Sequence, residues 1–201
     1  MKSSARKKRT CQPIKWTSAQ KLLAVMREEA EAHPRFARDR LLFAIGFYTG
    51  LRISDILALT PIVLLEDLWE IKEKKTGKIR QIEINPSLRK HIKHSLKYMR
   101  LEDYHDFIFV GTRGPSTGKP MAIENANQII RSTFKRHDIK AAHPTSHTLR
   151  KTFGRRVYEF NGRSEDALVL LSKMFNHRSI QETREYIGLT RERIISAYVN
   201  I

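Results

Sequence analysis

Cysteine, acidic residues and long apolar runs are all scarce in this sequence of 201 residues. The single cysteine, Cys11, excludes an internal disulfide framework and is typical of a reducing compartment. No window approaches the roughly 18 consecutive apolar residues that a membrane-spanning helix requires. The N-terminus, MKSSARKKRT, is basic like the start of a signal peptide but lacks the apolar segment that should follow. We therefore expect a cytoplasmic protein.

The shortage of acidic residues gives the chain a strong positive charge. Lys and Arg number 38 against 21 Asp and Glu, so the formal net charge is +17. Such an excess predicts a polyanionic partner, first of all nucleic acid. Charge alone leaves a ribosomal, RNA-binding or membrane-surface protein open. A hydrophobic content of 40% over this length is enough for a core, which excludes a disordered cationic tail.

The hydrophobic pattern predicts a mainly α protein with one small antiparallel β-sheet, an α+β fold. Residues 1–16 are basic and aperiodic, and we expect a flexible arm that either follows phosphates or only aids solubility. Residues 17–201 then form the folded domain. The expected helices span 17–32, 35–49, 54–59, a stretch beginning near Asn85, 123–137, 147–160, 164–175, 179–187 and 190–199.

Local signals set the expected ends of these elements. Residues 17–20, TSAQ, have the form of a capping box that opens the first helix. Gly50 suits a helix end and Pro61 a helix stop. Residues 68–71 and 79–84 alternate with period two, as strands do, and the intervening KKTGK is typical of a hairpin tip.

Several polar residues occupy awkward positions in apolar surroundings. Arg52 lies in TGLRISDIL, where a half-buried arginine needs an anion, which is either a ligand or Asp55. His147 and Arg150, in HTLRKTF, are three apart and share one helix face, while Leu149 points to the core. Together they can grip one phosphate, although a solvated helix face gives the same pattern.

Two further features mean little when taken singly. Lys75 lies at the predicted hairpin tip, where lysines are common on any protein. His177 precedes Tyr186 by nine residues, across a helix start at Ser179.

The sequence contains few candidate ligands for a metal ion. His143 and His147 are four apart, but Pro144 and the missing glutamate of a HExxH-type motif argue against zinc. There is no acidic cluster of the kind that two-metal nucleases use.

Taken together in chain order, these motifs resemble the tyrosine recombinase (phage integrase) family. The resemblance is carried by TGLRISDIL, KKTGK, HTLRKTF, FNHRS and TREYIG, and it covers about residues 17–199. The catalytic set that it implies is Arg52, Lys75, His147, Arg150, His177 and Tyr186. It also implies the recombinase catalytic-domain fold, and neither a cofactor nor a metal.

The implied activity is site-specific DNA recombination, as integration, excision or inversion, through a 3′-phosphotyrosine. Tyr186 would be the nucleophile, and Arg52 and Arg150 would each donate in a fork to the phosphate oxygens. His147 would act as general base and acid, or as a further phosphate donor. His177 would donate to a non-bridging oxygen.

The resemblance also implies roles on the hairpin side of the site. Lys75 would protonate the 5′-oxygen leaving group. Asp55, standing where many members have Glu, would orient His147 or Arg52. Lys151 stands where His is common.

Family members usually carry a core-binding domain before the catalytic domain, whereas only about 16 residues precede the first helix here. This favours a minimal, catalytic-domain-only recombinase similar to the fimbrial phase-switch invertases.

The expected partner is double-stranded DNA, with no membrane involved. The family resemblance implies a homotetramer on DNA that exchanges its C-terminal helices, although that helix could also pack on its own domain. Accessory DNA-bending proteins and a place on the nucleoid of a bacterium, archaeon or phage-infected cell also follow. Residues 111–120 and the helices at 123–137 and 147–160 are candidates for base reading. A non-catalytic DNA-binding regulator and a type IB-like topoisomerase remain the rival hypotheses.

Overall fold

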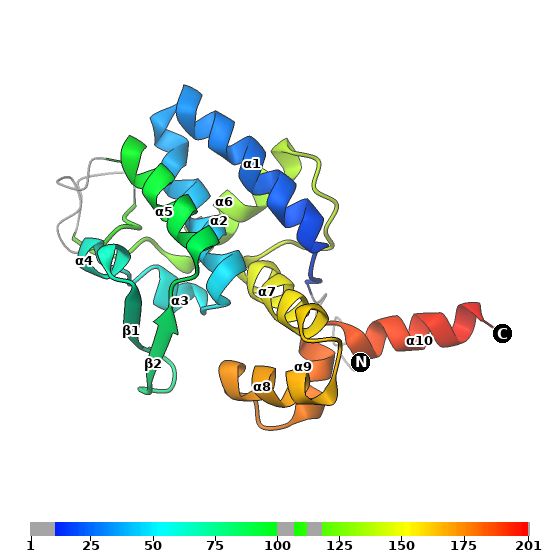
Figure 1. Ribbon diagram of the computed structural model, residues 1–201. Helices are drawn as coiled ribbons and strands as arrows, with labels where there is room; N and C mark the ends of the chain where they lie inside the picture. Colours follow the sequence, from blue (N-terminus) through cyan, green and yellow to red (C-terminus); the bar gives the residue numbers. More distant parts are fainter. Residues whose placement is uncertain (1–10, 100–106, 112–117, 201) are drawn as a thin grey trace, which may run out of the picture.

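The structure, a computed structural model, describes residues 11–99, 107–111 and 118–200 (Figure 1). Within these ranges the chain is mainly helical with one two-stranded antiparallel sheet, which confirms the predicted fold class. The elements are α1 (Trp16–Ala32), the 3-10 turn η1 (Pro34–Phe36), α2 (Ala37–Thr49), α3 (Ile53–Ile56), α4 (Pro61–Leu65), β1 (Leu68–Lys72), β2 (Ile79–Glu83), α5 (Pro86–Tyr98), α6 (Ile123–Arg136), α7 (Ser146–Phe160), α8 (Glu165–Phe175), α9 (Ile180–Tyr186) and α10 (Leu189–Val199). No helix of the described chain is long and apolar enough to cross a membrane.

Helix α2 is the centre of the larger hydrophobic core. It packs against α1, α5 and α7, which surround it in Figure 1. Leu41, Phe43 and Phe47 on α2 are completely buried. This is the apolar run LLFAIGFY, and its burial on nearly all sides explains why it shows no amphipathic pattern.

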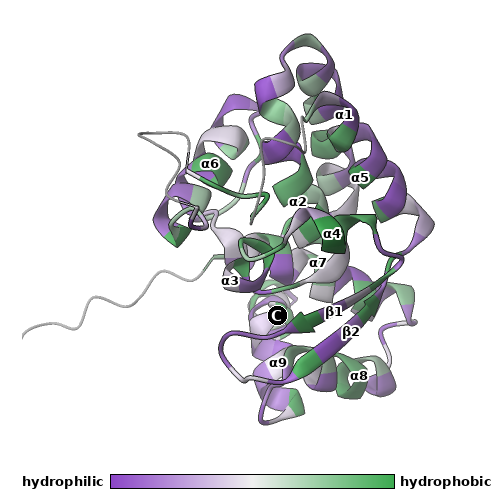
Figure 2. Ribbon diagram, turned by 90° about the vertical axis from the view of Figure 1, so that its left-hand side faces the viewer, coloured by the Kyte–Doolittle hydropathy of each residue, from purple (hydrophilic) through white to green (hydrophobic). Residues whose placement is uncertain are grey.

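A smaller second core holds α8 and α9 against α7. Its buried members are Leu168, Leu171, Phe175 and Ile187. Helix α7 joins the two cores, because Leu149 is buried in the first and Phe153 packs on the second. Figure 2 shows α8 and α9 below the main helical body, beside the β-hairpin.

Strands β1 and β2 pair in antiparallel register from Leu68 opposite Glu83 to Lys72 opposite Ile79. Trp69 and Ile71 face inward, as the alternating pattern predicts. The Glu73 amide donates to the Lys78 carbonyl at 2.9 Å and closes the hairpin tip.

Two predicted element ends are confirmed by their caps. Gly50 ends α2 in the left-handed conformation, with φ of 59°. The Asn85 side chain accepts a hydrogen bond from the Leu88 amide at 2.9 Å at the start of α5.

Two other predicted signals are wrong. The 17–20 stretch is not a capping box, since α1 begins at Trp16 after Lys15 with no side-chain cap. Burial of Ile14, which is 7% exposed, anchors this end instead. Pro61 does not stop a helix but opens α4, where its missing N–H costs nothing.

The predicted flexible arm divides into two parts. Residues 1–10 lie outside the described residues. Residues 11–15, in contrast, pack on the domain, and the Ile14 amide donates to Thr152 Oγ1 at 3.0 Å.

At the other end, α10 projects from the body in Figure 1. Its apolar side chains Ile194, Ile195, Tyr198 and Val199 are 53%, 50%, 79% and 76% exposed. The helix therefore does not bury this face on its own domain.

Candidate active site

Arg52 is held at the junction between α2 and α3. The left-handed turn at Gly50 reverses the chain, and Arg52 then becomes the residue before the first turn of α3. Its guanidinium donates to Glu73 Oε2 at 2.6 Å and to the Phe175 carbonyl at 3.3 Å. The arginine is thus fixed by groups that are distant in the sequence.

Arg150 is more deeply buried, at 4% exposed. One of its nitrogens donates to the Gly50 carbonyl, and another donates to the Phe175 carbonyl at 3.3 Å. Its guanidinium also lies 4.2 Å from the centre of the Phe175 ring. Burial lowers the pKa of Arg150 to about 10, which leaves it charged at neutral pH.

The Phe175 carbonyl oxygen therefore accepts hydrogen bonds from both Arg52 and Arg150. Two cations approach one acceptor at 3.3 Å each, and among the described residues a single carboxylate, that of Glu73, is bound to one of them. This concentration of positive charge suits a dianionic or phosphodiester ligand.

The Tyr186 hydroxyl lies 3.1 Å from His147 Nδ1. His147 occupies the first turn of α7, which begins with a reciprocal capping box between Thr145 and Thr148. Partial burial lowers the pKa of His147, and the neighbouring charges of Lys151, Arg150 and Lys75 lower it further. The ring is therefore neutral at pH 7 and able to accept the phenol proton.

Burial also changes the nucleophile itself. It raises the pKa of Tyr186 to about 12, an effect that Arg150 and Arg52 only partly oppose. At pH 7 only about one phenol in 10⁵ would ionise without help, so this tyrosine needs a base.

His177 lies on the other side of the tyrosine. Its ring centre is 5.1 Å from that of Tyr186. Its Nδ1 lies 3.0 Å from Thr183 Oγ1. The Thr183 hydroxyl also donates to the Ser179 carbonyl, at 3.4 Å. His177 thus precedes α9 and Tyr186 ends it, as the nine-residue spacing predicts, and the fold of this segment brings the two rings together.

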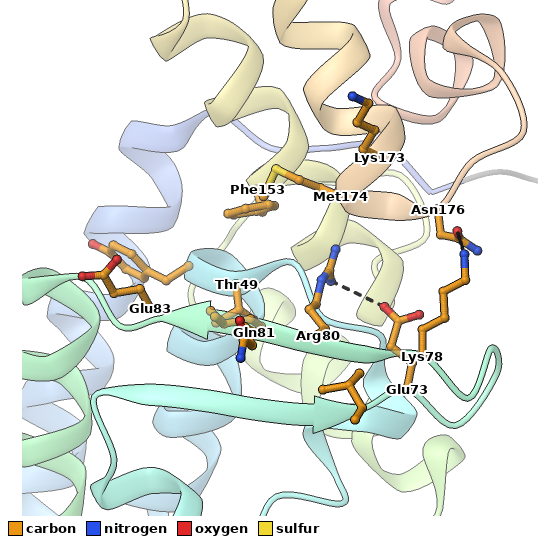
Figure 3. Close-up of a pocket in the computed structure, with 13 residues that line it drawn as sticks. Thr49, Glu73, Lys78, Arg80, Gln81, Glu83, Phe153, Lys173, Met174 and Asn176 are labelled. Carbon is orange, nitrogen blue, oxygen red and sulfur yellow. Dashed lines mark hydrogen bonds and ion pairs between the residues drawn. The ribbon is translucent and has the colours of Figure 1, made fainter.

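Lys75 is exposed at the tip of the hairpin and lines a cavity that is also lined by His177 and Tyr186. Figure 3 shows the adjoining groove of about 520 Å³ between β2 and the end of α8. There Lys78 Nζ donates to Asn176 Oδ1 at 3.2 Å, next to His177. This contact ties the hairpin to the loop before α9 and keeps Lys75 near the site.

Glu73 is a site residue that was not predicted from the sequence. Its carboxylate is 5% exposed and accepts hydrogen bonds from Arg52 and from the Thr76 hydroxyl at 2.8 Å, with Arg80 at 3.7 Å (Figure 3). Burial opposes ionisation, but the bonds from Thr76 and Arg52 leave the pKa of Glu73 below its ordinary value. A signal was present, because Glu73 continues the inward-facing alternation of Trp69 and Ile71.

Asp55 does not make the contacts expected of it. Its Oδ1 accepts hydrogen bonds from the Lys74 amide at 3.0 Å and from the Ser54 hydroxyl at 3.3 Å. Neither Arg52 nor His147 is its hydrogen-bond partner among the described residues. The carboxylate instead holds the base of the hairpin that carries Lys75.

One cavity collects the predicted catalytic side chains. Its volume is about 410 Å³, and all six residues predicted from the motifs line it, from four separate parts of the chain. They are Arg52, Lys75, His147, Arg150, His177 and Tyr186.

Comparison with known proteins shows the family to which this chain belongs. The model of the Phage integrase family matches residues 15–193. The probable integrase/recombinase YoeC of Bacillus subtilis is 36% identical over 163 residues, which are 80% of this chain and 83% of YoeC. The tyrosine recombinase XerD of Lacticaseibacillus casei is 25% identical over 181 residues, 87% of this chain and 58% of XerD.

Solved structures show the same fold. The XerH site-specific recombinase bound to palindromic difH substrate in a post-cleavage complex has a TM-score of 0.69 at 20% identity, covering 93% of this chain and 52% of that one. A lambda integrase dimer bound to a COC′ core site has a TM-score of 0.59 at 18% identity, covering 88% and 47%.

The fold and the site define a tyrosine-type site-specific DNA recombinase. This chain belongs to the phage integrase family. It covers most of YoeC but only about half of the XerH chain.

Proposed function

We propose that this chain cleaves and rejoins DNA strands through a covalent 3′-phosphotyrosine at Tyr186. One observation carries the proposal, namely the tyrosine hydroxyl 3.1 Å from His147 in a cavity that also holds two arginines. Nucleophile, base and charge-neutralising groups are thus brought together in one cavity.

In the proposed step, Tyr186 Oη attacks the scissile phosphorus and its proton passes to His147 Nδ1. The P–O5′ bond breaks as the P–O bond to tyrosine forms, and the 5′-oxygen takes a proton from Lys75. Attack by the 5′-hydroxyl of another strand reverses these transfers and frees the tyrosine, so no external energy source is needed.

The arginines supply the largest contribution in this scheme. Arg52 and Arg150 direct N–H groups toward the non-bridging oxygens, whose charge grows in the pentavalent transition state. Both are preorganised by the Phe175 carbonyl, so little reorganisation is needed when DNA binds.

His177 completes the phosphate contacts. The contact of His177 Nδ1 with Thr183 Oγ1 at 3.0 Å orients the ring, and in this scheme a protonated Nε2 donates to a phosphate oxygen. Asp55 supports Lys75 by holding the hairpin through the Lys74 amide.

Covalent trapping tests the proposal directly. Nicked suicide duplexes carrying the native flanking repeats, incubated with the protein in EDTA, should yield a slow-migrating adduct on a denaturing gel. Tyr186→Phe should form at least about 10³-fold less adduct, because the attacking oxygen is gone. Tyr98→Phe on α5 is the matched control and should behave like wild type. Adduct formation by Tyr186→Phe would contradict the assignment.

The cleavage rate should also depend on pH through His147. At subsaturating DNA, the rate should rise with pH through a His147 pKa below 6.5 and then level off, because only the neutral ring accepts the proton. His147→Ala should lose this rising limb and be about 10²-fold slower at pH 7.5. His177→Asn should be slower but retain the limb. A limb that disappears in His177→Asn and persists in His147→Ala would exchange the two assignments.

The uncovered apolar face of α10 suggests how protomers assemble. We infer that α10 docks on a neighbouring copy in a homotetramer on DNA, since Ile194, Tyr198 and Val199 are 53%, 79% and 76% exposed. Accessory DNA-bending proteins and a place on the nucleoid fit such an assembly.

The alternative function is a DNA-binding regulator that keeps the fold without catalysis. A regulator has no need for a tyrosine with a base at 3.1 Å, and this contact favours the enzyme. DNA binding without any adduct on validated sites would favour the regulator.

A further inference from the structure

Lys151, the residue after Arg150, is a lysine with an unusual environment. It is only 8% exposed, and burial lowers its pKa. Its ammonium donates to the Cys11 carbonyl at 2.8 Å and lies 5.0 Å from the centre of the Tyr186 ring. No carboxylate pairs with it among the described residues, so these two contacts are what stabilises a buried charge.

The position of Lys151 on α7 explains the second contact. His147 and Lys151 are four residues apart and therefore share one helix face. His147 contacts the hydroxyl of Tyr186, and Lys151 contacts the ring. One face of α7 thus holds the nucleophile at two points.

The first contact leads to the N-terminal segment Cys11–Ile14, here called the strap. Besides the bond from Lys151 to Cys11, the Ile14 amide donates to Thr152 Oγ1 at 3.0 Å. Two successive residues of α7 therefore anchor the strap at both of its ends.

The strap also lies beside the turn that follows the nucleophile. Gly188, two residues after Tyr186, has φ of 88°, and a methyl group there would lie 3.3 Å from Gln12 Oε1 and 3.6 Å from Pro13 Cδ. A shift of the strap would therefore move both Lys151 and the end of α9.

We propose that Lys151 is a positioning residue that couples the strap to Tyr186, so that the N-terminal segment sets the reactive position of the nucleophile. The proposal rests on the phosphotyrosine function above. It assigns Lys151 no contact with DNA, because its ammonium is buried and already engaged.

The test uses full-length Lys151→Met, Thr152→Val and the double variant, with the exposed Lys21→Met on α1 as the matched control. Lys151→Met should lower the single-turnover cleavage rate at saturating DNA about tenfold or more, since small misplacements of a nucleophile are costly. DNA affinity should stay within about threefold, as engaged lysines do not contact phosphates.

Thr152→Val removes the acceptor for Ile14 without touching Tyr186, and it should also slow cleavage. The double variant should be no more than about threefold slower than the slower single variant, because both act through the strap.

A second readout is independent of catalysis. The Ile187 and Gly188 amides donate to the Thr183 and Glu185 carbonyls at 3.0 and 3.1 Å. Their hydrogen exchange in DNA-free protein should accelerate in Lys151→Met and Thr152→Val, while α6 amides exchange as in wild type. If Lys151→Met fails to fold, Thr152→Val alone decides the question.

Three results would overturn the proposal. They are wild-type cleavage and exchange in Thr152→Val, a loss of DNA affinity in Lys151→Met that accounts for its slower cleavage, and additive losses in the double variant. If wild-type protein forms no adduct at all, the phosphotyrosine function is wrong. Hydrogen exchange of the Ile187 and Gly188 amides still tests whether the strap positions the end of α9.

Discussion

Arg150→Ala is expected to lower the rate of strand cleavage by about 10³-fold or more. Its guanidinium is the buried partner of Arg52 at the Phe175 carbonyl, and losing such a donor removes charge stabilisation in the transition state. Arg150→Lys should recover only part of the rate, because lysine keeps the charge but not the planar fork. The measurement is single-turnover adduct formation on suicide duplexes.

Stability and binding must be followed in the same variants. Arg150→Ala leaves the Gly50 carbonyl without its donor, which should cost about 1–3 kcal/mol of unfolding free energy. The surface variant Arg27→Ala on α1 should match wild type in rate and binding. Arg150→Ala that cleaves within about tenfold of wild type at equal occupancy would contradict the assigned role.

The second large effect concerns stability and involves Gly50. Gly50→Ala should lower the free energy of unfolding by about 2–5 kcal/mol, since it combines a left-handed backbone with a clash. The backbone φ is 59°, and the new methyl would overlap the Phe153 ring at Cδ1. Cleavage should fall as well, because the Gly50 carbonyl holds Arg150.

Gly162→Ala separates the two causes. Gly162 has a similar φ of 69°, but an added methyl would meet nothing within 4 Å. It should therefore show only the backbone cost, about 1 kcal/mol. Urea unfolding of both variants measures the difference, and equal destabilisation would show that packing against Phe153 is unimportant.

The sequence predicted, through motifs that resemble a known family, six residues that the structure gathers in one cavity. Arg52 follows a helix-ending glycine, and His147 and Arg150 share the first turns of one helix. Such features depend on neighbours within about four residues, which periodicity and caps report. For the same reason most helices and both strands begin and end within a few residues of their predicted positions.

Tertiary structure decided what those residues touch. Arg52 could pair with Asp55 by sequence distance, but its anion is Glu73, because the β1–β2 hairpin brings that carboxylate across 21 residues. Asp55 instead accepts the Lys74 amide. Long-range pairs of this kind depend on how the hairpin packs, and no local pattern encodes that.

The N-terminal segment makes the same point. Sequence periodicity predicted a loose arm before the first helix, yet residues 11–15 lie on α7 and beside the nucleophile, because Ile14 is buried and Lys151 binds a carbonyl 140 residues away. Residue types and local spacing thus predicted which groups line the cavity of the candidate site. Only the packing of two cores about α7 decided where each group is held, since burial, which raises the pKa of Tyr186 to about 12, exists only in the folded chain.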